Sequence, residues 1–173
     1  MSARIRNPFT PSFGQIPLYM AGRDLVIDEI MRAFENGVGD PNLSTILIGA
    51  RGSGKTALMS LLAHEAQGFG WLSVNVSALP GMLEDIAQQA KAVASSIVSV
   101  SSHAKIKSVG VPQILDIEWE RDAVEQPNWR MRMSAILEGL NASDVGLLIT
   151  VDEVRADLDE LIQLVSVHQH FIR

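Results

Sequence analysis

The pattern of apolar and polar residues divides the chain into alternating helical and strand-like segments. Apolar residues recur at helical spacing in five segments, which are residues 24–36, 55–66, 82–100, 128–140 and 157–171. Short apolar runs bounded by turn residues are typical of buried strands, and they lie at residues 44–48, 71–76 and 146–151. This alternation predicts an α/β fold built around a mostly parallel central sheet.

Two further segments do not follow this alternation. Prolines interrupt regular structure near the N-terminus, so residues 1–16 are expected to form an extended arm. Between residues 103 and 120, apolar and polar residues alternate around Gly110 and Pro112, which predicts a β-hairpin-like insertion. Residues 17–173, with this insertion included, are expected to form one core domain.

Composition and charge narrow the class of protein. Apolar residues make up 47% of the chain and charged residues 20%, which is enough apolar surface for a hydrophobic core. The chain has no cysteine, which excludes disulfides and thiol catalysis and suits a reducing compartment. No run approaches the roughly 18 apolar residues of a membrane span. We therefore expect a cytoplasmic protein without a membrane segment, and the net charge of −6 gives no support to nucleic-acid binding.

A glycine-rich segment connects the first expected strand to the next helix. Residues 49–56 read Gly-Ala-Arg-Gly-Ser-Gly-Lys-Thr and match the pattern G-x-x-x-x-G-K-[ST] at every fixed position. Glycines let the backbone curl so that successive N–H groups face one point, and the helix adds its positive dipole end. Lys55 is expected to reach the β- and γ-phosphates of a nucleotide, and Thr56 to coordinate Mg²⁺. The residues assigned to nucleotide contact are Gly49, Ala50, Arg51, Gly52, Ser53, Gly54, Lys55, Thr56 and Ala57.

A second candidate element lies at the end of the last expected strand. Residues 147–151, Leu-Leu-Ile-Thr-Val, are mostly apolar and lead directly into Asp152 and Glu153. The carboxyl ends of parallel strands form the edge at which open α/β sheets bind ligands. Asp152 is suited to hold Mg²⁺ through its water shell, and Glu153 to orient and polarise the water that attacks the γ-phosphate. A solvated acidic turn would explain these two residues taken alone, so the assignment depends on the phosphate-binding loop.

Together the two motifs resemble those of the AAA+ ATPases, in particular the initiator-like branch related to origin-recognition ATPases. Residues 18–24, Leu-Tyr-Met-Ala-Gly-Arg-Asp, are similar to the segment that precedes the first helix in this family and packs around the adenine. Residues 74–76, Val-Asn-Val, resemble the second strand of that branch. The resemblance covers most of residues 16–170. It implies a P-loop three-layer sandwich that binds ATP and Mg²⁺, with Gly22 and Arg23 beside the adenine.

The chain also departs from the AAA+ pattern. It ends before a sensor-1 strand and a helical lid, and neither a sensor-2 arginine nor an arginine finger is identifiable. We therefore expect the front part of a larger ATPase, with low activity on its own. Because such ATPases often complete one subunit's site with a neighbour's arginine, the resemblance implies a homo-oligomer as one arrangement. As an alternative, the resemblance implies a protein or DNA partner that binds through a missing C-terminal part.

Several functions remain open on the sequence alone. The leading hypothesis is an ATP-hydrolysing motor or switch, which Glu153 favours. The first alternative is a regulatory module that binds ATP or ADP with little turnover, which the absent sensor elements favour. A P-loop kinase would need an acceptor pocket and a basic lid, and a GTPase would show an Asn-Lys-x-Asp segment, which does not occur. DNA binding rests on the family resemblance alone, because no helix-turn-helix pattern is present.

Overall fold

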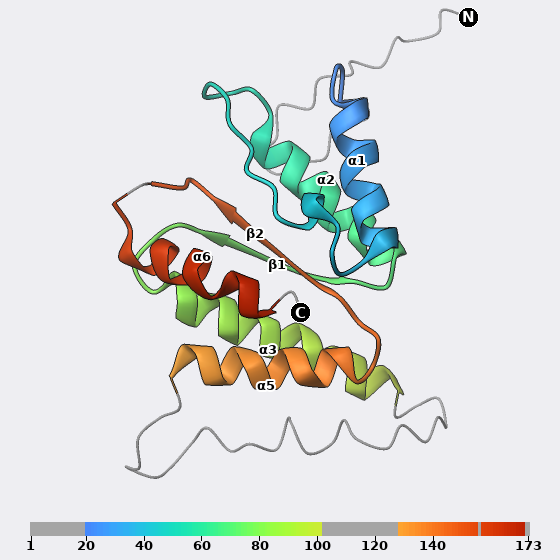
Figure 1. The fold of residues 1–173 in the computed structure, drawn as a ribbon, viewed down its shortest axis with the longest axis vertical. Helices are drawn as coiled ribbons and strands as arrows, with labels where there is room; N and C mark the ends of the chain where they lie inside the picture. The colour runs from blue at the N-terminus through green and yellow to red at the C-terminus, as the bar shows by residue number, and fades with distance from the viewer. Residues whose placement is uncertain (1–19, 102–127, 156, 172–173) are drawn as a thin grey trace, which may run out of the picture. The chain divides into compact units, whose positions relative to one another are not determined.

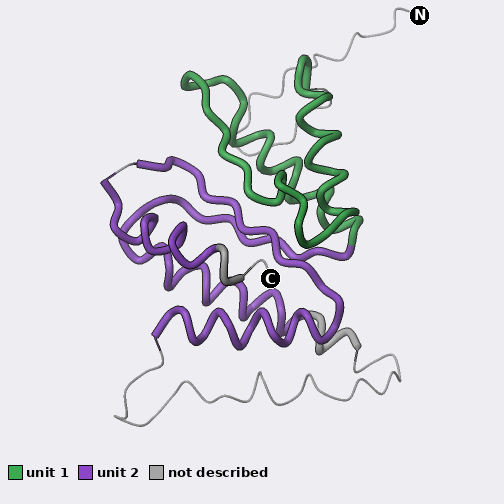
Figure 2. Tube along the Cα trace, viewed as in Figure 1, with its two compact units in different colours: residues 1–69 green, residues 70–173 purple. Residues whose placement is uncertain are grey.

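The computed structural model describes residues 20–101, 128–155 and 157–171 (Figure 1). The chain divides into two compact units, residues 1–69 and 70–173 (Figure 2). Each unit has its own helices and its own buried apolar side chains, and each is described by itself. The expected N-terminal arm and the expected hairpin-like insertion lie outside the described residues.

The first unit contains two α-helices, α1 (Asp24–Asn36) and α2 (Lys55–Gly68), and the short 3-10 helix η1 (Pro41–Leu43). Helix α1 ends at Gly37, whose φ of 69° lies in the left-handed region and whose N–H donates to the carbonyl of Ala33. The apolar sides of α1 and α2 are buried, through Ile30, Ala33, Phe34, Leu58, Leu62, Ala63 and Ala66. Both helices therefore form as the apolar spacing predicted.

The strand expected at residues 44–48 is not present. These residues have no β-ladder partner within the described parts of the chain. The side chains of Ile46 and Ile48 are 85% and 89% exposed, so the run is not buried either. An apolar β-branched run favours a strand, but it becomes one only where another strand pairs with its N–H and C=O groups. The prediction of a buried strand here is wrong in this structure.

The second unit is a mixed helix and strand structure with a parallel two-stranded sheet. In chain order its described elements are β1 (Leu72–Ser77), α3 (Met82–Ser101), α5 (Trp129–Asn141), β2 (Leu147–Asp152) and α6 (Asp159–Phe171). The strands pair in register from Leu72 opposite Leu147 to Ser77 opposite Asp152. Two parallel strands need a long connection between them, and α3 and α5 lie within it. The α/β class and both of these strands are confirmed, whereas a three-layer P-loop sandwich goes beyond what the structure shows.

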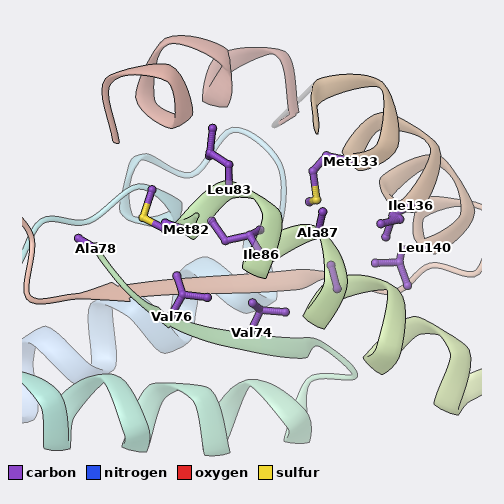
Figure 3. Close-up of a cluster of buried hydrophobic side chains, with 11 residues drawn as sticks. Val74, Val76, Ala78, Met82, Leu83, Ile86, Ala87, Met133, Ile136 and Leu140 are labelled. Carbon is purple, nitrogen blue, oxygen red and sulfur yellow. The ribbon is translucent and has the colours of Figure 1, made fainter. Parts of the chain in front are cut away.

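The two faces of this sheet differ in character. Val74 and Val76 of β1 are buried against α3, and they alternate with exposed Asn75 and Ser77. Figure 3 shows how side chains from β1, α3 and α5 meet in one cluster. Its buried members are Val74, Val76, Ala78, Met82, Leu83, Ile86, Ala87, Ala90, Met133, Ile136 and Leu140. Among the described residues of the second unit, this buried cluster lies on the face of the sheet that carries Val74 and Val76.

Polar contacts tie the helices of the second unit together. Glu160 of α6 accepts the N–H groups of Gly81 and Leu83 at 2.7 and 2.8 Å, and so caps the N-terminus of α3. On the side of α3, Glu84 forms an ion pair with Arg132 of α5. These contacts hold α3, α5 and α6 in one packed arrangement beside the strand that ends at Asp152.

Candidate functional site

The glycine-rich segment forms a tight loop that runs directly into α2. Gly52 and Gly54 have φ angles of 79° and 82°, which are in the left-handed region and open to glycine at little energy. The N–H of Ser53 donates to the carbonyl of Ala50 at 3.2 Å and closes a turn inside the loop. Gly54 is the N-cap of α2 and supplies no side chain to cap it. The N–H groups of the first helical turn are therefore without a side-chain cap and suited to binding an anion.

Lys55 is folded back over the start of the loop. Its Nζ donates to the carbonyls of Gly49 and Ala50, at 2.9 Å each. The ammonium group therefore lies at the loop itself, and it can exchange these two carbonyls for the oxygens of an anion. Its neighbours in the motif, Arg51 and Thr56, are exposed, and Ala57 is half-buried in α2.

Ser53 shows that the interior of the loop fits a polar ligand. Its Oγ atom is buried and has no hydrogen-bond partner among the described residues. A Cβ atom on Gly49 would come within 2.9 Å of that Oγ, so glycine leaves room for the hydroxyl where a larger residue would displace it. Buried hydroxyl groups usually have a partner. The oxygen of a bound phosphate would supply this hydrogen-bond partner. The interior of the loop is therefore compatible with a bound phosphate group.

The segment before α1 lies against the loop. Arg23 donates from Nη2 to the carbonyl of Ser53 at 2.8 Å. The methyl carbon of Met20 is 3.9 Å from the position of a Cβ on Gly54. Gly22 has a φ of 71° and open space around it. The structure thus brings Arg23 to the loop, and the contact that Arg23 makes is with the loop backbone. The placement of Gly22 and Arg23 beside an adenine stays a prediction.

Asp152 and Glu153 lie in the second unit, where β2 ends. Asp152 is half-buried, and its Oδ1 accepts the N–H of Glu153 at 2.8 Å. Glu153 is exposed and has a φ of 55°, a left-handed conformation that disfavours a residue with a Cβ by roughly 1 kcal/mol or more. Strained residues of this kind concentrate at functional sites. The sharp turn after β2 therefore favours a functional role for Glu153.

The parallel sheet has a polar face that was not predicted from the sequence. Residues opposite one another in a parallel register point to the same side, so Asp152 shares a face with Ser77 and Thr150. Thr150 donates its hydroxyl to Oδ1 of Asn75 on the neighbouring strand. The polar residues at every second position of β1 were the available signal for this face.

The candidate residues are grouped by unit. Residues 49–57, Gly22 and Arg23 belong to the first unit, and Asp152 and Glu153 belong to the second. No cluster of three His, Asp or Glu side chains suited to a metal occurs in the part of the chain that the structure describes. Mg²⁺ in nucleotide sites is usually held by one or two protein oxygens together with phosphates and water. Thr56 and Asp152 remain the residues whose chemistry suits that ion.

Comparisons of the chain with protein-family models, with curated proteins and with solved structures found no match. Within the described residues, no helix is both long and apolar enough to cross a membrane.

Proposed function

We propose that the chain is an ATP-binding P-loop domain of AAA+ type that hydrolyses ATP and acts as a motor or switch for a partner. Its complete fold would then be the three-layer P-loop sandwich that the sequence predicts. The ligands would be ATP and ADP, and the metal would be Mg²⁺. The domain would act either as a homo-oligomer or through a protein or DNA partner.

The conformation of residues 49–56 carries this proposal. Two glycines with positive φ angles curl the backbone, and Lys55 reaches back over the first residues of the loop. The hydroxyl of Ser53 is buried and has no hydrogen-bond partner in the described part of the chain. A loop that only joined two elements would need none of these features. All three are explained if the loop surrounds a phosphate group.

Glu153 is proposed as the residue that orients and polarises the attacking water. Its carboxylate is exposed, and the turn after β2 holds it in a strained backbone conformation. Asp152 and Thr56 would supply oxygen ligands for Mg²⁺, which neutralises charge on the phosphates when it is bound. The cytoplasmic setting expected from the sequence belongs to the same proposal.

The binding part is tested by calorimetric titration of Mg²⁺–ATP into the chain and two variants. Lys55→Ala removes the ammonium group from the loop and should weaken binding by about tenfold or more. Arg32→Ala removes an exposed cation on α1, outside the loop, and is the matched control, with a change expected below about threefold. Equal affinities for the unmodified chain and Lys55→Ala would contradict a phosphate-binding loop.

The catalytic part is tested by steady-state phosphate release from ATP. Glu153→Gln should lower turnover by about a hundredfold or more, because a positioned general base contributes that much, while ATP affinity stays nearly constant. Asp157→Asn, in the same exposed segment, is the control and should retain turnover. Binding without measurable turnover in the unmodified chain would favour the nucleotide-gated regulatory module instead.

A further inference from the structure

We propose that Arg23 is a positioning residue for the phosphate-binding loop, acting through the Ser53–Gly54 peptide. This inference rests on the proposed function, because it concerns the same nucleotide site. It assigns Arg23 a role toward the phosphates, in place of the contact with adenine that the sequence resemblance implied.

Arg23 contacts the loop at Ser53, which has a glycine on each side. The guanidinium of Arg23 is partly buried and donates to the carbonyl of Ser53 at 2.8 Å, across 30 residues of sequence. Ser53 lies between Gly52 and Gly54, which both have positive φ angles. Glycines with positive φ angles give a loop many accessible conformations. The hydrogen bond from Arg23, which lies outside the loop, therefore restricts the loop where its backbone is most flexible.

The contact with Arg23 also determines the direction of the N–H group of Gly54. In a trans peptide, the C=O of one residue and the N–H of the following residue point in opposite directions. A carbonyl of Ser53 held toward Arg23 therefore sends the N–H of Gly54 away from Arg23. Gly54 is the N-cap of α2, where unpaired N–H groups bind anions. Arg23 thus sets the orientation of one expected phosphate donor without touching the phosphate.

Arg23 is itself held in place by the hydrogen bonds of its own backbone. Its own N–H donates to the carbonyl of Met20 at 3.2 Å, and its carbonyl accepts the N–H of Ile27 at 3.0 Å, so its backbone belongs to the start of α1. The methyl carbon of Met20 lies 3.9 Å from where a Cβ on Gly54 would be. In the described structure Arg23 has no acidic partner, so its charge is not neutralised by an ion pair. A fixed donor of this kind lowers the ordering cost of ligand binding, because the loop is arranged beforehand.

The test separates phosphate recognition from base recognition. Mg²⁺–ATP, Mg²⁺–tripolyphosphate and adenosine are titrated into the full chain and into Arg23→Met. If Arg23 orients the loop, ATP and tripolyphosphate should both lose affinity by a similar factor, roughly tenfold, while adenosine binding stays unchanged. An adenine contact would instead weaken ATP and adenosine and leave tripolyphosphate unaffected, and that result would overturn the proposal.

A spectroscopic readout distinguishes this role from a general loss of structure. In the ligand-free protein, the amide resonance of Gly54 should move in Arg23→Met, while that of Gly68 at the far end of α2 should stay in place. Arg32→Met, which removes an exposed arginine on α1, is the matched control and should change neither resonance. An unchanged Gly54 amide would overturn the proposal without any ligand. If Arg23→Met does not fold, Arg23→Lys serves for the same measurements, because lysine keeps the charge and loses the planar donor geometry.

Failure of the proposed function is recognised separately. If the unmodified chain binds neither ATP nor tripolyphosphate, the phosphate-binding loop itself is overturned, and this role for Arg23 with it. If the unmodified chain binds both and Arg23→Met binds tripolyphosphate equally well, the proposed function stands and only the role of Arg23 fails.

Discussion

Gly146 lies against the indole ring of Trp71, next to the start of the parallel sheet. A Cβ atom at this position would come within 2.2 Å of a ring carbon of Trp71. The N–H of Leu72 donates to the carbonyl of Gly146 at 2.8 Å, so the same residue also takes part in the first bond between the strands. A side chain here would have to displace either the indole or the strand.

We therefore expect Gly146→Ala to lower the free energy of unfolding by about 1–3 kcal/mol, the usual effect of overpacking. Gly68→Ala is the control, because no atom lies within 4 Å of the added Cβ and α2 ends at that residue. That variant should leave stability unchanged or raise it by up to about 1 kcal/mol. Urea unfolding followed by circular dichroism measures both, and equal effects would show that the indole moves aside freely.

The sequence alone does not reveal this contact. Gly146 precedes an apolar run and looks like an ordinary turn residue, and Trp71 looks like the first residue of a strand. The approach of one to the other depends on the register in which residues 72–77 and 147–152 pair. Register is set by packing between strands that are distant in sequence.

At the scale of the elements, α3 is held by charged groups from two other helices. Glu160 of α6 caps its N-terminus, and Arg132 of α5 binds the Glu84 carboxylate in its first turn. The hydrogen bonds from Arg132 lower the pKa of Glu84 below its ordinary value, and partial burial opposes this effect. The folded protein therefore holds Glu84 in the charged form more strongly than the unfolded chain does.

This pKa shift makes part of the stability pH-dependent. Because the pKa is lower in the folded state, the contribution of Glu84 is present above its unfolded pKa and is lost as the pH falls through the lower folded pKa. Glu84→Gln should therefore be less stable than the unmodified chain at pH 7, and the difference should shrink in acid. Urea unfolding midpoints at pH 7 and near pH 3 measure this. Glu138→Gln, an exposed change on α5, should show no such trend, and a constant difference for Glu84→Gln would refute the argument.

The helices on either side of this ion pair were predicted with nearly correct ends. The expected helix at 82–100 is α3 (Met82–Ser101), and the expected helix at 128–140 is α5 (Trp129–Asn141). Apolar spacing and caps are local properties, and Asn128 indeed caps α5 by accepting the N–H of Met131 at 3.0 Å. The pairing of Glu84 with Arg132 was not predictable, because either residue reads as an ordinary solvated charge.

At the scale of the whole molecule, the chain has two compact units, each with buried apolar side chains of its own. Leu58 is fully buried in the first unit, and Met133 is fully buried in the second. Neither side chain can be shortened without leaving a cavity. The units are therefore expected to open as separate cooperative regions.

Hydrogen exchange measured by mass spectrometry tests this expectation. Leu58→Ala should destabilise by about 2–5 kcal/mol and should lower protection mainly in α1 and α2. Met133→Ala should lower protection mainly in α3 and α5. Each variant is the control for the other. Equal loss of protection in both units for either variant would show that the chain opens as one cooperative body.

The sequence by itself determined the helices, the two paired strands and the phosphate-loop motif. Apolar spacing, caps and glycine positions depend on residues that are close together in the sequence. Only the tertiary structure decided what depends on partners distant in sequence. Residues 44–48 have the composition of a buried strand, but they have no strand partner among the described residues, and Ile46 and Ile48 are exposed. A strand needs a neighbour for its backbone hydrogen bonds. Arg23 and Ser53 meet for the same kind of reason, since the fold of the first unit brings the start of α1 to the loop.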